Sequence, residues 1–268
     1  MRVPRLACFI TVLLITLVIC PAHAAVSAPR NEAAIATLDG MSPPAEGFSF
    51  VVWGDCRDDK GKFDDVIAKI NELNPLFTVG LGDYISNGTR KEYDAFIQRI
   101  AALNQPLISV IGNHDAHDGG KKIWLREFGD TNFYFDFGGV RFICLDNADL
   151  KLDADELSFL EDKLQVDMPR IVFAHTPPDY GRWGAHCFRK GSDAFLDLLH
   201  KYRVEYAFFA HIHLYDKLRI GPTTCIISGG AGAPLYGSYG FGGPNIHVVN
   251  VTVKDGRITA DYVPVYGM

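Results

Sequence analysis

Residues 48–57 carry the sequence FSFVVWGDCR, in which an apolar run of strand type ends abruptly at a glycine and an aspartate. The pattern returns further along, where a run over 76–81 is followed by Gly-Asp and a run over 107–111 by Gly-Asn-His-Asp. Between these runs lie two segments whose apolar residues recur at the spacing of one helix face. Residues 48–111 therefore predict a β-α-β-α-β unit, typical of a largely parallel sheet covered by helices.

The second half of the chain repeats this alternation less regularly. Two further helices are predicted, near 153–164 and 193–202, and the last two strands are predicted to join at Asp255-Gly256 as an antiparallel pair. The predicted fold is α/β, with two stacked mixed β-sheets flanked by helices in a four-layer α/β/β/α sandwich. The remaining strand-like runs lie over 133–137, 140–145, 171–174, 204–209, 224–228, 245–253 and 257–265.

The composition is that of an ordinary globular chain of 268 residues, with 48% hydrophobic and 22% charged residues. A chain of this size buries a sizeable core as one large domain, which we place at residues 48–268. Residues 25–47, rich in alanine, proline and small polar residues, are expected to form a linker.

The first residues, 1–24, have the features of a signal peptide. Two arginines precede the apolar run 6–20, and the small-x-small tripeptide 22–24 offers a cleavage site. The protein is therefore expected to be exported, either periplasmic or secreted, with no stable membrane span after cleavage. An uncleaved anchor or a lipid on Cys20 fits less well, because the run is short and bulky residues precede that cysteine.

The charge balance argues against a nucleic-acid partner. The formal net charge is −6, and it becomes −8 when the two arginines of the leader are removed. An acidic protein lacks the broad basic footprint of a nucleic-acid binder, so a site for anionic phosphate would need bound metal cations as its positive charge. The cysteines show no zinc-ribbon spacing, and Cys144 and Cys225 are expected to be buried within strands. The sequence assigns neither a disulfide nor an oligomeric state.

Polar residues collect where the predicted strands end, the edge at which open α/β sheets bind ligands. A single Gly-Asp after a strand is ordinary turn chemistry, and a lone histidine often caps a turn. The joint occurrence of carboxylates, an amide and imidazoles instead predicts a site for divalent metal ions. The strand-end residues are Asp55, Asp83, Asn113, His175, His211 and His213.

With these blocks the chain resembles the calcineurin-like metallophosphoesterases, whose ordered pattern is D-x-H, G-D, G-N-H-[DE], H and G-H-x-H. The resemblance covers about residues 48–253. Residues 132–146 and the glycine-rich stretch 229–233 are similar to the purple-acid-phosphatase-like branch.

The resemblance implies a role for each matching residue. Asp83 would bridge two divalent ions of manganese, iron or zinc, with Asp55 and His213 on the first ion. Asn113, His175 and His211 would hold the second ion. His114 would be the general acid that protonates the leaving group. Asp115 is expected either to orient that histidine or to cap a helix.

Two positions depart from the family pattern. The histidine of D-x-H is Arg57, and the tyrosine of the purple iron enzymes is replaced by Ser86, so an iron-tyrosinate chromophore is not implied. We expect Arg57 to bind substrate phosphate, because a guanidinium fork matches two phosphate oxygens. The alternative is an arginine turned outward to pair with Asp58 or Asp59.

The predicted function is metal-dependent hydrolysis of phosphate esters through a dinuclear centre and a metal-bound hydroxide. The partner is a small phosphorylated substrate, and monoesters, diesters, nucleotides and lipid headgroups all remain open. The alternative is a degenerate, non-catalytic module that binds a phosphorylated ligand or a protein. Residues in neighbouring loops either reach substrate or serve the fold: His117, His186, Tyr180, Trp183 and Phe241.

Overall fold

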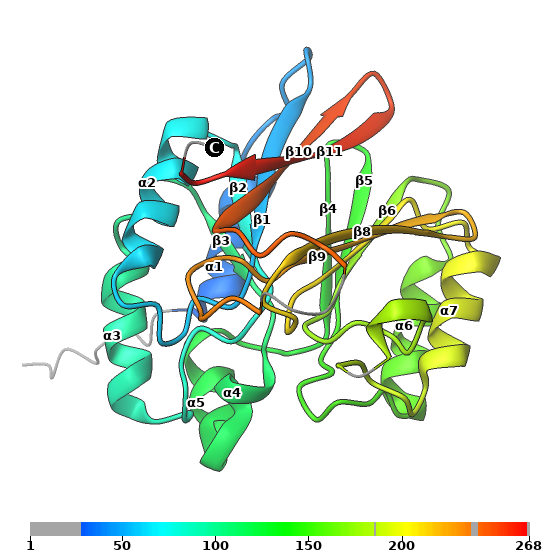
Figure 1. Ribbon diagram of the computed structural model, residues 1–268. Helices are drawn as coiled ribbons and strands as arrows, with labels where there is room; N and C mark the ends of the chain where they lie inside the picture. Colours follow the sequence, from blue (N-terminus) through cyan, green and yellow to red (C-terminus); the bar gives the residue numbers. More distant parts are fainter. Residues whose placement is uncertain (1–27, 185, 237–240, 267–268) are drawn as a thin grey trace, which may run out of the picture.

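The computed structural model describes residues 28–184, 186–236 and 241–266, so the predicted signal peptide lies outside the described residues. Two β-sheets face each other (Figure 1), one with strand order β11-β10-β1-β2-β3 and the other with order β4-β5-β6-β7-β9-β8. The strands are β1 (Phe48–Trp53), β2 (Phe77–Gly80), β3 (Leu107–Ser109), β4 (Phe133–Phe137), β5 (Val140–Cys144), β6 (Arg170–Phe173), β7 (Tyr206–Phe209), β8 (Tyr215–Ile220), β9 (Thr223–Ser228), β10 (His247–Lys254) and β11 (Arg257–Pro264).

The first sheet contains the predicted β-α-β-α-β unit. Strands β1, β2 and β3 are parallel, while β10 pairs antiparallel with β1 and then with β11. The β10-β11 turn contains Asp255 and Gly256, both with positive φ (50° and 70°), as a tight hairpin of primed type requires. The predicted hairpin is confirmed.

The second sheet is also mixed. Strands β5, β6, β7 and β9 run parallel, and the antiparallel strands β4 and β8 form its two edges. Strand β8 is absent from the sequence prediction, because its exposed residues alternate with only partly buried ones and no strong apolar period results.

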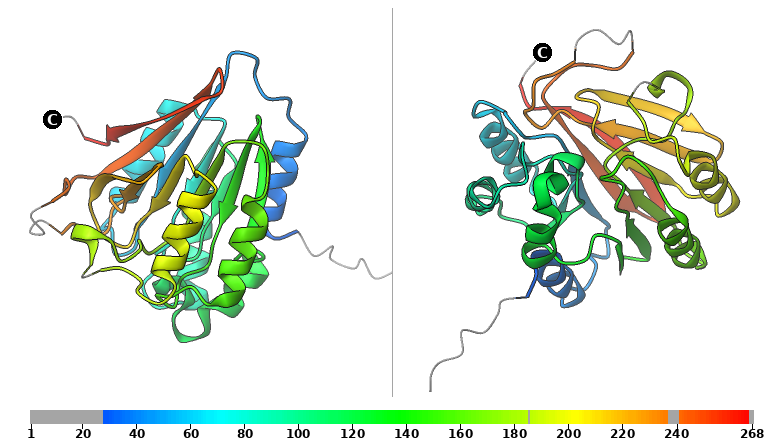
Figure 2. Two further views of the ribbon diagram at one scale, coloured as in Figure 1. Left: turned by 90° about the vertical axis from the view of Figure 1, so that its right-hand side faces the viewer. Right: turned by 90° about the horizontal axis from the view of Figure 1, so that it is seen from below.

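The space between the sheets is filled by a core rich in phenylalanine. The ring of Phe50 stacks on Phe77 at a centroid distance of 4.9 Å and meets Phe142 edge-on at 5.4 Å. Helices cover the outer faces, α2 and α3 on the first sheet and α6 and α7 on the second (Figures 1 and 2), so the predicted four-layer sandwich is confirmed. The helices are α1 (Arg30–Asp39), α2 (Lys62–Leu73), α3 (Arg90–Ile100), α4 (Asn113–Ala116), α5 (Gly120–Glu127), α6 (Ala154–Leu164) and α7 (Ser192–Lys201), with short 3-10 turns η1 (His117–Gly119) and η2 (Gly181–Trp183).

Helix α1 lies inside the stretch 25–47 for which the sequence predicts a linker. It packs beside β3 and β4 (Figure 2), with Ala34 and Leu38 buried in the core between the sheets. Asn31 fixes it further, because its side chain exchanges two hydrogen bonds with the backbone of Ser109, at 2.9 and 2.8 Å. The packed domain therefore begins before Phe48. The sequence of α1 predicted a linker because the helix buries only Asn31, Ala34 and Leu38, too few apolar residues for a clear helical pattern.

Two smaller expectations concern burial. Cys144 and Cys225 are fully buried, as predicted, and no disulfide joins the cysteines of the described residues. Within 28–184, 186–236 and 241–266, no helix has the length and apolar character needed to cross a bilayer.

Candidate metal centre

The residues predicted from the strand ends meet at one side of the two sheets. Asp55 and Asp83 follow β1 and β2, and Asn113 begins α4 just beyond β3. From the second sheet, His175 follows β6, and the His211-Ile212-His213 segment follows β7. Each sheet thus supplies part of the ligand set, because both send the carboxyl ends of parallel strands to this edge.

The loops at this edge have a strained backbone. Asp55, Asp83 and His211 adopt left-handed conformations, with φ of 58°, 56° and 65°. Such a conformation costs a non-glycine residue about 1–2 kcal/mol, and it persists where surrounding structure enforces it. Here the two aspartate loops hydrogen-bond each other, and a Cβ at Gly112 would collide with the backbone of Asp83.

Asp115 links the loop that contains Asp83 to the start of α4. Its buried carboxylate accepts hydrogen bonds from the backbone N–H groups of Asp83 (2.8 Å), Tyr84 (2.9 Å) and Gly112 (2.9 Å). The sequence left open whether Asp115 orients His114 or caps a helix. The contacts support the capping role at the start of α4, together with a link to the Asp83 loop.

One set of ligands, which we call the His175 group, consists of Asp83, Asn113, His175 and His211. The Nε2 atom of His175 lies 3.0 Å from Asn113 Oδ1 and 3.3 Å from Asp83 Oδ1, and His211 Nδ1 lies 3.0 Å from the same asparagine oxygen. On its far side, His175 Nδ1 donates to the Leu81 carbonyl at 2.8 Å. That bond fixes the tautomer and leaves Nε2 free to bind a metal.

The second set, the Asp55 group, consists of Asp55, Asp83 and His213. His213 Nε2 lies 3.6 Å from Asp55 Oδ1, while its Nδ1 donates to the Pro234 carbonyl at 2.7 Å. The Tyr236 ring stacks on the imidazole of His213 with centroids 4.5 Å apart. Sequence patterns gave no signal for the last two contacts, since one uses a backbone carbonyl and the other a loop tyrosine with no motif around it.

The donor set fits divalent metal ions. Potential ligand atoms of Asp83, His175 and His211 lie within 4.8 Å of one another, as do those of Asp55, Asp83 and His213, and Asp83 belongs to both sets. Both carboxylate oxygens of Asp55 are buried without a hydrogen-bond partner among the described residues. A buried, unpaired carboxylate is costly, and a cation bound between these groups would remove that cost.

The electrostatics of the two aspartates differ. Burial raises the pKa of Asp55 well above its usual range, and the neighbouring Asp83 carboxylate raises it further. Burial also opposes ionisation of Asp83, but the neighbouring His175 and His114, together with the hydrogen bond from the His114 backbone N–H, outweigh it and the pKa of Asp83 is lowered. Asp83 is therefore the carboxylate most readily kept ionised at this centre.

The imidazoles are held in their neutral form, which is the form that binds metals. Burial lowers the pKa of His211 to about 3 and that of His213 to about 4. Burial likewise lowers the pKa of His175 below its usual value.

Arg57 approaches the shared carboxylate. Its Nε lies 3.5 Å from Asp83 Oδ2, and its Nη1 donates to Asp58 Oδ2 at 3.0 Å. The side chain is only 17% exposed. The pairing with Asp58 therefore occurs, but the arginine is not turned away from the site, and Asp59 pairs with Arg99 instead, at 2.8 Å.

His114 lies on the same side of the centre. Its backbone N–H donates to Asp83 Oδ1 at 3.0 Å, and its Nδ1 is 2.8 Å from the carbonyl oxygen of Ser86. Since Nδ1 donates to that carbonyl, Nε2 is the nitrogen left to exchange a proton with a substrate, and it lies 4.0 Å from Asp83 Oδ2.

Three of the other loop residues lie in different surroundings. The ring of His186 lies 6.5 Å from that of His211, at the edge of the centre. The side chain of His117 is 60% exposed and pairs with Asp118. Trp183 is an anchor, because it is buried and donates its Nε1–H to Asp216 at 2.7 Å.

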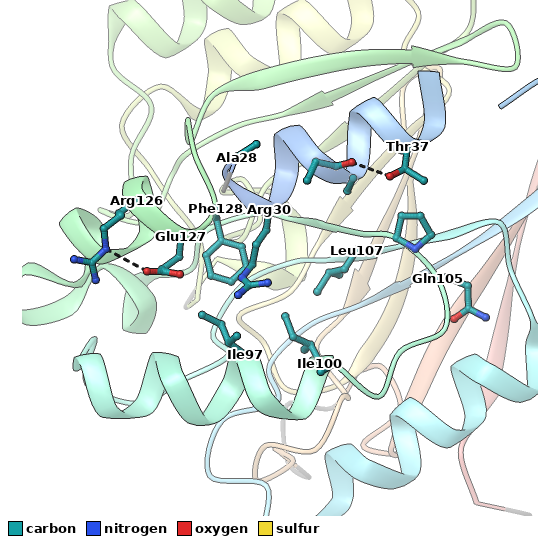
Figure 3. A pocket seen from close by; sticks show the side chains of 14 residues that line it. Ala28, Arg30, Thr37, Ile97, Ile100, Gln105, Leu107, Arg126, Glu127 and Phe128 are labelled. Carbon is teal, nitrogen blue, oxygen red and sulfur yellow. Dashed lines mark hydrogen bonds and ion pairs between the residues drawn. The ribbon is translucent and has the colours of Figure 1, made fainter. Parts of the chain in front are cut away.

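A separate cavity of about 620 Å³ lies between α1, α3 and α5 (Figure 3). Arg30, Ile97 and Phe128 are among its lining residues, and none of the candidate ligands lines it. The Arg126–Glu127 ion pair crosses its rim at 3.1 Å. This cavity is therefore distinct from the metal centre.

Strand-end carboxylates and imidazoles from two facing sheets form a candidate metal centre. The family model described as calcineurin-like phosphoesterase matches residues 48–215. The chain belongs to the calcineurin-like phosphoesterase family.

Individual relatives lie in the same family. The chain is 28% identical over 189 residues to a probable inactive purple acid phosphatase of Arabidopsis thaliana. This match covers 58% of this chain and 31% of the relative. It is 28% identical over 166 residues to a probable cyclic nucleotide phosphodiesterase of Rhodopseudomonas palustris, over 55% of this chain and 61% of the relative. The chain thus spans less than two thirds of the length of each of these relatives.

A solved structure shares the fold. The purple acid phosphatase PPD1 from yellow lupin seeds superposes with a TM-score of 0.68 at 17% identity, covering 84% of this chain and 52% of the lupin chain. Similarity at this level of identity supports the sandwich architecture.

Proposed function

We propose that this protein is a hydrolase of phosphate esters that works with two divalent metal ions, one in the Asp55 group and one in the His175 group. The observation that carries the proposal is that the two groups share the Asp83 carboxylate. The oxygens of Asp55 support it, because they are buried without a hydrogen-bond partner among the described residues and a bound cation would compensate them. Manganese, iron and zinc all suit this mixed oxygen and nitrogen donor set.

Metal ions bound there would polarise the phosphoryl group and supply a water acidified to a hydroxide nucleophile. The protein's part is to hold the ligands and the reacting groups. The hydrogen bonds of His175 to Leu81 and of His213 to Pro234 orient two imidazoles before any ion binds. We assign no covalent enzyme intermediate, because no nucleophile and base pair accompanies the ligands.

His114 is assigned as the general acid. The Ser86 carbonyl holds its Nδ1–H, which directs Nε2 towards the side of Asp83 where the ester would sit. Nε2 would donate a proton to the leaving oxygen.

Arg57 is assigned to the substrate phosphate. Among the described residues only its Nη1 forms a hydrogen bond, and its Nε is buried facing Asp83, so Nη2 is the donor proposed to reach phosphate oxygens. Its place next to Asp83 brings this cation within reach of a phosphate bound at the metals. The substrate is proposed to be a small phosphorylated molecule. We also propose that the protein meets it outside the cytoplasm, as a periplasmic or secreted protein, because a signal peptide is predicted at residues 1–24.

The test is release of nitrophenol from nitrophenyl phosphate and from bis-nitrophenyl phosphate, with manganese added or with a chelator. We expect turnover that the chelator abolishes, and Asp83→Asn should remove it. Asp197→Asn on the exposed face of α7 is the matched control, because it makes the same chemical change away from the centre. Turnover that survives both the chelator and Asp83→Asn would rule out the proposal.

A second function is supported by one observation, the guanidinium of Arg57 beside Asp83 where the family pattern has a histidine ligand. If that cation replaces a metal ion, the site would bind a phosphorylated ligand or protein without hydrolysing it. The relative named as a probable inactive phosphatase is in keeping with such a loss. Phosphate binding without release of nitrophenol from either ester would favour this function.

A further inference from the structure

The two departures from the family pattern, Arg57 and Ser86, are joined in the structure. Arg57 lies in the loop after β1, and Ser86 lies in the loop after β2. Asp58 stands between them: its Oδ2 accepts from Arg57 Nη1 at 3.0 Å, and its Oδ1 accepts from the Ser86 hydroxyl at 2.6 Å. Both oxygens of one carboxylate are thus occupied by these two residues.

This arrangement differs from an ordinary surface ion pair. The Asp58 side chain is 54% exposed, and an exposed pair contributes little stability by itself. The Ser86 hydroxyl, however, prevents free rotation of the Asp58 carboxylate, and Arg57 is mostly buried with its Nε facing Asp83. The backbone of Asp58 is also left-handed, with φ of 51°, a conformation that a non-glycine residue keeps where the surrounding structure enforces it.

Ser86 has a second contact, made by its backbone. Its carbonyl accepts from His114 Nδ1 at 2.8 Å. The hydroxyl of Ser86 therefore acts on the residue assigned to bind phosphate, while its carbonyl acts on the residue assigned as general acid. The two effects are separable, because a side-chain substitution removes the hydroxyl and leaves the carbonyl.

We propose that Asp58 and Ser86 are positioning residues that hold the Arg57 guanidinium ready for a phosphate group. The inference rests on the proposed function, since it needs phosphate to bind at this centre. An arginine side chain loses much rotational freedom when it is fixed, and the Asp58–Ser86 pair fixes it before the ligand arrives. Preorganisation of this kind strengthens binding without adding a contact to the ligand.

The first arm of the test measures binding of inorganic phosphate to the manganese-loaded protein by calorimetry. Ser86→Ala is expected to weaken phosphate binding about 3- to 10-fold, within the range for one hydrogen bond to a charged group. Asp58→Asn is expected to weaken it similarly, and Ser86→Thr, which keeps a hydroxyl, to recover most of the affinity. Manganese stoichiometry should not change, because none of these side chains belongs to either ligand group.

The second arm separates positioning from a general structural effect. In an Arg57→Ala background, Ser86→Ala should cause no further loss of phosphate affinity, because the group that it positions is gone. The dependence of turnover on leaving-group pKa should also be unchanged in Ser86→Ala, since the carbonyl on His114 is retained.

Unaltered phosphate affinity in Ser86→Ala, or the same loss with and without Arg57, would overturn this inference alone. Failure of the unsubstituted protein to bind phosphate and to release nitrophenol would overturn the proposed function, and this inference with it.

Discussion

The His175 group and the Asp55 group differ in how fully the protein satisfies their ligands. His175 is held through its ring Nδ1–H to the Leu81 carbonyl and through its backbone N–H to Asn147 Oδ1 at 3.1 Å, and these bonds leave its unprotonated Nε2 facing Asn113 Oδ1 at 3.0 Å. In the Asp55 group, neither carboxylate oxygen of Asp55 has a hydrogen-bond partner among the described residues. We therefore expect the first group to be the more preorganised, and the second to depend more on a bound cation to compensate its charge.

Arg57 sharpens this difference. It approaches the shared Asp83 carboxylate at a distance of 3.5 Å, and it occupies the sequence position of a histidine ligand in the family. A guanidinium cannot ligate a metal, so the Asp55 group has one ligand fewer and a competing positive charge nearby. We therefore expect the two groups to bind metal with unequal affinity, the His175 group more tightly.

The largest expected effect comes from the residue that the two groups share. Asp83→Asn should lower turnover by more than about 100-fold, beyond the usual cost of changing a residue that only supports a ligand. Bound metal should fall at both groups together. Steady-state kinetics and metal analysis on the same sample check this, and full metal content in the variant would contradict the shared role.

The next effect concerns His114, which belongs to neither ligand group. His114→Ala should slow turnover by about 10²- to 10⁴-fold, the usual contribution of a general acid, while metal content stays the same. The loss should be smaller for esters with good leaving groups, because these need less protonation. An equal loss for all leaving groups would indicate a binding role instead.

A smaller effect is expected at the residue that distinguishes the Asp55 group. Arg57→Ala should raise the Michaelis constant or lower turnover by about 10- to 100-fold, the range for lost charge-assisted hydrogen bonds, without loss of metal. Arg57→His should tighten metal binding at the Asp55 group, since it restores an imidazole and removes a cation. Unchanged kinetics in the first variant and unchanged metal affinity in the second would together refute the assignment.

The last effect concerns stability rather than turnover, and it comes from a buried imidazole outside both groups. His247 is fully buried in β10, its Nδ1 lies 2.8 Å from the Asn245 carbonyl, and burial lowers its pKa to about 4. An unfolded chain takes up this proton near pH 6.5, so between these values the unfolded state binds more protons and stability falls as pH is lowered.

Because of His247, the free energy of unfolding should fall by about 3 kcal/mol as pH is lowered from 6.5 to 4. Denaturant unfolding at several pH values checks it, because His247→Gln should flatten the pH dependence below pH 6.5 and leave metal binding intact. An unchanged pH dependence in His247→Gln would show that this imidazole does not contribute.

Much of the fold could be predicted from the sequence, because its strands are strongly apolar and end at sharp polar boundaries. The run over 48–53 ends one residue before the Gly54-Asp55 turn, and the helix after it buries the face formed by Phe63, Val66 and Ile70. What could not be predicted is the docking of α1, which depends on a side chain, Asn31, that meets Ser109 only in three dimensions.

The candidate ligands were found because each lies at the end of a strand, where pattern and chemistry coincide. The residues that orient them carry no such signal. Asn147, Pro234 and Asp115 act through backbone carbonyls or backbone N–H groups of distant loops, and such contacts leave no periodicity in the sequence. The sequence did offer a pairing of Arg57 with Asp58 as an alternative, but the contact of Asp58 with Ser86 gave no signal, because it joins two loops.

The most direct test of the account is a calorimetric titration of the chelator-treated protein with manganese. The account predicts two ions per chain with unequal affinities, loss of the weaker event alone in His213→Ala, and loss of both events in Asp83→Asn. A single ion per chain, or two ions retained in Asp83→Asn, would contradict the claim that two metal sites share this carboxylate.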